Sequence, residues 1–147
     1  MNKLTLGRLF GLAVTVLALN TYVIGRLILP HSEIAANTVF ILVRVGTLLG
    51  FSFALAYWLG RGRWEIVRLG ALLEFLDRGI FGGSLILNDY FTNKAAWLGA
   101  SVVQPLFVIG WSFMIISPVF IILCLLGSVA GQDLAARRIR LASASKH

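Results

Sequence analysis

The stretch that decides the fold runs from Trp97 to Val129 and reads WLGASVVQPLFVIGWSFMIISPVFIILCLLGSV. It holds no charged residue and is longer than the roughly 20 apolar residues that cross a bilayer. Two complete spans with a turn between them would need a still longer stretch. Pro105 and Pro118 each lack a backbone donor and favour a bend. We therefore expect a short lead-in helix and one kinked span, with a re-entrant segment as the alternative.

The composition of the whole chain also indicates a lipid environment. Of its 147 residues, 59% are hydrophobic and only 13% are charged, and the mean hydropathy is +0.89. A soluble domain has about a quarter of its residues charged, because charged side chains cover its surface. Here the charge is missing from long continuous blocks, which is typical of segments buried in a bilayer.

Three further apolar blocks precede this stretch, at about 9–29, 38–60 and 65–87. The first is longer than the core of a signal peptide and has no Ala-x-Ala cleavage site after it, so we interpret it as a span. The third is less apolar because it carries charged residues, yet a helix can hide one charged stripe against its neighbours. The sequence therefore predicts an all-α membrane protein, a bundle of four transmembrane helices with short loops and a kinked last helix, at about 97–129.

The chain divides into one transmembrane domain, residues 1–132, and a basic tail, residues 133–147. The tail begins as a helical extension and ends in an Ala/Ser-rich segment that we expect to be flexible. Its arginines are placed to meet anionic lipid headgroups. The residues that we predict to lie at the membrane surface are all basic: Arg61, Arg63, Arg68, Arg137, Arg138 and Arg140.

The distribution of Lys and Arg predicts the orientation. Two precede the first span, none lies between the first and second, three lie in Arg61 to Arg68, one follows the third, and four lie in the tail. Positive segments thus alternate with neutral ones, as the positive-inside rule requires for four spans with both ends inside. We expect a multi-pass protein of the bacterial cytoplasmic (inner) membrane with both termini cytoplasmic.

Four charged residues inside the predicted spans form the main candidate site. Glu74, Asp77 and Arg78 share one side of a helix, and Glu74 stands in the favourable order for an ion pair with Arg78. Asp77 is then left without a partner, and Arg44 is the basic residue nearest to the same depth. Because an unpaired charge in hydrocarbon costs several kcal/mol, the stripe must face the bundle, water or a partner. Either a packing network or a proton or ion site satisfies this condition.

Small residues mark the candidate packing faces. Gly46, Gly50 and Ala54 recur at intervals of four and would allow a neighbouring helix to approach closely. The alternative is that glycine is simply common in membrane helices. Gly79 and Gly83 complete the predicted packing set on the third span.

These features favour an interaction protein: a non-catalytic subunit or oligomerising component that packs against other membrane helices. A small ion-coupled or proton-coupled transporter or channel is the competing interpretation.

We predict no enzyme activity, since no HExxH, paired cysteines or phosphate loop occurs. We expect no cofactor and no metal, because Cys124 is the single cysteine and the two histidines lie at His31 and His147. The expected partners are anionic headgroups and other membrane helices, and nucleic acid is excluded because the basic residues sit at the ends of apolar blocks.

Overall fold

The structure, a computed structural model, describes residues 3–23, 33–93 and 101–144. In these ranges it is all-helical and contains no strand, which confirms the all-α part of the predicted fold class. The helices are α1 (Lys3–Val23), α2 (Glu33–Leu59), α3 (Arg63–Glu74), a π-helical segment η2 (Phe75–Gly82), α4 (Gly83–Thr92) and α5 (Val103–Ala144). Helices suit this sequence because they satisfy their own backbone hydrogen bonds, which lipid cannot do.

The expected number of four helices is wrong for the described residues, because five α-helices are present. The third predicted helix, 65–87, is divided into α3, η2 and α4, although helical turns continue without a break from Arg63 to Thr92. Three helices are individually long and apolar enough to cross a membrane, within Thr5–Val23, Thr38–Leu59 and Pro118–Ala144. The end of the first predicted span and the start of the fourth lie outside the described residues.

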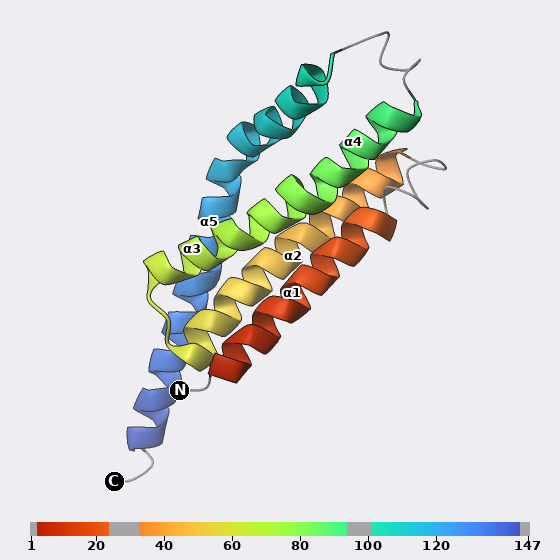
Figure 1. Cartoon of the computed structure of the whole chain (residues 1–147). Helices are drawn as coiled ribbons and strands as arrows, with labels where there is room; N and C mark the ends of the chain where they lie inside the picture. The colour runs from red at the N-terminus through yellow and green to blue at the C-terminus, as the bar shows by residue number, and fades with distance from the viewer. Residues whose placement is uncertain (1–2, 24–32, 94–100, 145–147) are drawn as a thin grey trace.

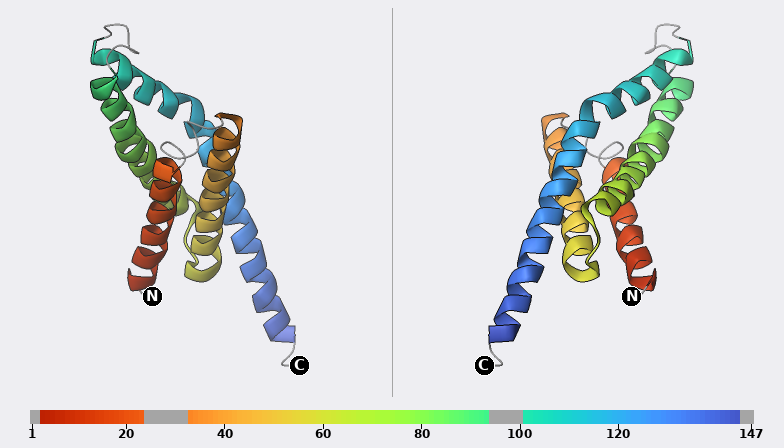
Figure 2. Two further views of the ribbon diagram at one scale, coloured as in Figure 1. Left: turned by 90° about the vertical axis from the view of Figure 1, so that its right-hand side faces the viewer. Right: turned by 90° about the vertical axis from the view of Figure 1, so that its left-hand side faces the viewer.

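The last helix corrects one expectation. The sequence predicts a separate lead-in helix, but α5 is one helix of 42 residues with Pro118 inside it. Figure 2 shows that α5 changes direction along its length, and a proline inside a helix favours such a bend. The helix continues to Ala144, and residues 145–147 of the predicted flexible end lie outside the described residues.

The chain turns sharply between α2 and α3. Gly60 has a φ of 58°, in the left-handed region that glycine adopts at little cost. Across this turn the Arg61 N–H donates to the Leu55 carbonyl at 3.2 Å, and the Ile66 N–H donates to the Gly62 carbonyl at 3.1 Å. The turn therefore closes α2 and starts α3 within a few residues.

Three helical rods lie side by side: α1, α2 and the continuous α3–η2–α4 (Figure 1). The fourth rod, α5, packs against α2 and α3 and extends past the rest of the bundle (Figure 2). Both chain ends and the α2–α3 turn lie at the same end of the molecule (Figure 1).

The apolar core is small and lies where the rods meet. Leu17, Leu55, Ile66, Leu73 and Cys124 are fully buried in it. Many large apolar side chains instead point outward, including Leu42 on α2 and Phe107 on α5, each 66% exposed. Such a surface suits lipid or other membrane helices far better than water.

Candidate functional site

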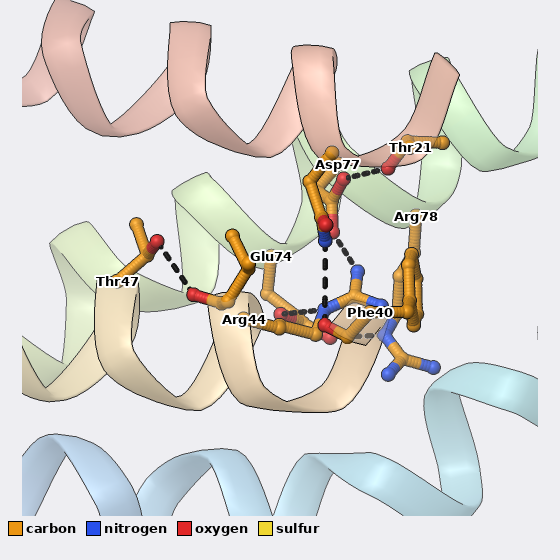
Figure 3. A network of polar contacts seen from close by, with 9 residues as sticks. Thr21, Phe40, Arg44, Thr47, Glu74, Asp77 and Arg78 are labelled. Carbon is orange, nitrogen blue, oxygen red and sulfur yellow. Dashed lines mark hydrogen bonds and ion pairs between the residues drawn. The ribbon is translucent and has the colours of Figure 1, made fainter. Parts of the chain in front are cut away.

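The candidate site lies at one level of the bundle, where α1, α2 and the start of η2 meet (Figure 3). Arg44 comes from α2, Glu74 is the last residue of α3, and Asp77 and Arg78 belong to η2. All four side chains are at least nine-tenths buried, and Asp77 is the most deeply buried at 2% exposed. The structure thus brings together the four charges that the sequence singled out.

The charges form a chain of ion pairs. Arg78 Nε pairs with Glu74 Oε1 across one turn of helix, and Arg44 Nη2 pairs with Asp77 Oδ2 between α2 and η2. Arg44 Nε also lies 3.6 Å from Glu74 Oε2, which links the two pairs. Two arginines and two carboxylates give no net charge, so the network offsets much of the cost of its own burial.

Uncharged groups extend the network to α1. The Thr21 hydroxyl donates to Asp77 Oδ1 at 2.8 Å, so one carboxylate contacts both α1 and α2. The Phe40 ring lies 4.8 Å from the Arg44 guanidinium carbon, a cation–π distance. Asn20 Nδ2 donates to the Phe40 carbonyl at 3.3 Å. These neutral contacts fix the position of Arg44 and Asp77 relative to three helices.

The π-helical segment η2 carries half of the charges. Its wider turn is visible at the end, where the Gly83 N–H donates to the Arg78 carbonyl five residues earlier. Gly82 and Gly83 stand next to each other at this point, and they add no side chain to the widened turn. Short π-helical turns inside α-helices are often found at functional sites, and nothing in the hydrophobic pattern of the sequence predicted this one.

A cavity of about 150 Å³ adjoins the network on the side of α5. Arg44, Glu74 and Arg78 contribute to its wall, and the remaining wall is apolar: Phe40, Ile41, Val45, Leu48, Val119, Phe120 and Leu123. Arg44 Nε and Glu74 Oε2 are buried and make no hydrogen bond to a described residue. The space is large enough for water, but these two atoms expose almost no surface to it and lie against each other instead.

The predicted small-residue face of α2 has empty space around its two glycines. A Cβ built on Gly46 or Gly50 would meet nothing within 4 Å. Both glycines line a groove of about 300 Å³ between α1 and α2, with Ala54 and Trp58 at its other end. Gly79 is half-buried in η2, and a Cβ on the buried Gly83 would make only ordinary contact with Ile109, at 3.4 Å.

Two other glycines form a close contact between α5 and α2. On α5, a Cβ at Gly127 would lie 2.7 Å from the Leu49 carbonyl, and one at Gly131 would lie 2.7 Å from the Phe53 carbonyl. Ser52 and Ala56 of α2 form the rest of this contact. This interface is not among the predicted packing faces, although the Gly-x-x-x-Gly spacing of Gly127 and Gly131 is visible in the sequence.

The six predicted surface arginines lie on the turn and the helices near the end of the bundle that carries both termini. Arg61 pairs with Glu65, and Arg63 Nε donates to Gln132 Oε1 at 3.3 Å. Arg137 Nε pairs with Asp133 at 2.9 Å, and Arg138 Nη1 donates to the Tyr57 hydroxyl at 3.4 Å. Arg68 and Arg140 are exposed. The α2–α3 turn and the end of α5 are therefore joined by polar contacts.

Cys124 is buried against α3, where a Cβ on Gly70 would lie 2.7 Å from its sulfur. Among the described residues, no group of three or more His, Cys, Asp or Glu side chains could hold a metal ion. Comparisons with protein-family models, with curated proteins and with solved structures find no match.

Proposed function

We propose that this protein is a non-catalytic component of a membrane protein complex, and that the groove between α1 and α2 receives a helix of a partner subunit or of a second copy. The observation that carries the proposal is the open groove over Gly46 and Gly50. The chain buries the four charges of the network internally but leaves this small-residue face open. Small residues on such a face let another helix approach closely, and close packing is the main source of attraction between helices in lipid.

The charge network supports a structural role. Its four charges are neutralised by each other, so that no partner charge is needed to balance them. Such a network ties α1, α2 and η2 together and fixes how these helices pair. In this proposal it shapes the groove and does not carry a substrate.

The proposal includes four membrane spans, with α3–η2–α4 as the third. From Arg63 to Thr92 these turns extend roughly 45 Å at 1.5 Å per residue, enough to cross a bilayer. They lie alongside α1 and α2 (Figure 1), and the ion pairs lower the cost of placing their charges in lipid. The basic turn and tail would face the cytoplasm of a bacterial cell, in its inner membrane.

The direct test is purification in a gentle detergent, with identification of co-purifying chains and measurement of the assembly's size. Gly50→Leu should fill the groove and release the partner while the isolated chain stays folded. Gly110→Leu is the matched control, because Gly110 is exposed on α5 and a Cβ there would meet nothing within 4 Å. An assembly unaffected by Gly50→Leu, or the absence of any assembly, would refute the proposal.

A second candidate is ion or proton transport, which the cavity beside Glu74 favours. Glu74 contributes to the wall of a space large enough for water, and a carboxylate beside such a space is a feature of proton and cation pathways. The predominantly apolar wall of this cavity and the closed set of ion pairs make it the weaker of the two.

A further inference from the structure

The face of α5 that packs on α2 continues beyond the contact with α2. Gly127 and Gly131 are followed at helical spacing by Leu134, Arg138 and Leu141, which therefore lie on the same side of α5. α2 ends at Leu59, so beyond that residue this side of α5 no longer packs against α2. It lines an open groove of about 560 Å³ instead. The groove is lined by six residues: Phe53, Tyr57, Leu134, Arg137, Arg138 and Leu141.

The groove combines two kinds of surface. Phe53 and Tyr57 stack with ring centroids 5.6 Å apart and, with the two leucines, form an apolar wall. Arg137 and Arg138 form the basic part. Arg138 contacts the Tyr57 hydroxyl and Arg137 contacts Asp133, but a guanidinium has five N–H donors, so each arginine keeps donors for an anion. Arg137 and Arg138 together keep a net positive charge, because Asp133 offsets only one of them.

The groove lies beside the end of α2 and the last turns of α5. The candidate span of α2 ends at Leu59, two residues after Tyr57. Tyr57 and Trp58 are amphipathic aromatic residues of the kind that gather at this boundary, and Trp58 is 64% exposed. Phe53 and Leu134 lie toward the middle of α2 and α5, and the two arginines follow them, an order that matches a molecule with a hydrocarbon tail and an anionic head.

We propose that this groove binds one anionic phospholipid. The phosphate would accept hydrogen bonds from Arg137 and Arg138, and one acyl chain would lie along Phe53 and Leu134. The bound lipid would fill the space between the ends of α2 and α5 and hold them together. This inference needs the membrane location but not a partner helix, so it can fail or succeed independently of the groove between α1 and α2.

The test is titration of the purified full chain, in detergent, with phosphatidylglycerol and with phosphatidylcholine, counting bound lipids by native mass spectrometry. We expect one preferred phosphatidylglycerol. Losing one charge-assisted hydrogen bond should weaken its binding about tenfold in Arg138→Gln. Arg140→Gln removes the same charge two residues away from a position outside the groove, and should change binding by less than about twofold. Tyr57→Phe should also weaken binding, because Arg138 loses its neutral contact.

Equal losses for Arg138→Gln and Arg140→Gln would mean only diffuse attraction to the tail and would overturn the proposal. So would equal binding of phosphatidylcholine, or equally tight binding of soluble glycerol phosphate, which lacks the acyl chain. Circular dichroism of each variant without added lipid verifies that its helices are intact, and all three changed side chains lie at the rim of the fold rather than in its core.

Discussion

Arg44 on α2 and Asp77 on η2 form an ion pair in the interior of the bundle, with side chains 9% and 2% exposed. The pair is not isolated, because Thr21 on α1 donates to the other oxygen of the same carboxylate. One aspartate thus connects three helical rods. In a low-dielectric interior, the stability of this connection depends on both partners being present.

We predict that Arg44 and Asp77 are energetically coupled. Arg44→Met or Asp77→Asn alone leaves one uncompensated buried charge and should lower the free energy of unfolding by about 3–5 kcal/mol. The double variant keeps the Glu74–Arg78 pair and is neutral, so it should recover about 1–3 kcal/mol of the summed loss. Unfolding in mixed micelles measures all four corners of this cycle. Strictly additive losses would show that the pair does not act as a unit.

We predict no proton or ion flux through the purified protein in proteoliposomes, under proton, sodium, potassium and chloride gradients. The reason is that the four charges are satisfied by one another and the adjoining cavity is mostly apolar. A fluorescent dye inside the vesicles reports proton flux, and vesicles without protein give the background. A flux that Glu74→Gln abolishes without loss of the folded protein would favour the transport interpretation instead.

We predict that the Gly127 contact is essential for packing α5 on α2. Gly127→Ala places a Cβ 2.7 Å from the Leu49 carbonyl, and the helices must separate to relieve it, at a cost of about 1–3 kcal/mol. Gly46→Ala, with nothing within 4 Å, should be close to neutral in the isolated chain. Thermal denaturation in detergent compares the two. Equal melting temperatures would mean that α5 does not pack through this glycine.

The sequence predicted the charged site better than the packing. Glu74 and Arg78 are neighbours on any helix, and Arg44 was assigned to Asp77 because few charges occur at that depth. The packing glycines could not be chosen in the same way. Gly46, Gly50, Gly127 and Gly131 have the same spacing, and which pair meets a neighbour depends on how the helices are rotated. The π-helical segment η2 could not be predicted either. It differs from an α-helix in which carbonyl accepts each N–H, and hydrophobic periodicity carries little information about that difference.

The last prediction concerns topology. Since both chain ends and the α2–α3 turn lie at the same end of the bundle (Figure 1), reporters fused after His147 and inserted at Arg61–Arg63 should report the same compartment. We expect this compartment to be the cytoplasm, because the arginines are concentrated at that end. A reporter inserted at 31–37, around the start of α2, should report the opposite side, as should one at 94–96, between α4 and α5. Each position is measured with two fusions. Alkaline phosphatase is active only outside, and the fluorescent protein is active only inside. The insertion at 94–96 is the decisive one. If it reported the cytoplasm while 31–37 reported outside, α3–η2–α4 would not cross the bilayer, and three spans would replace the proposed four.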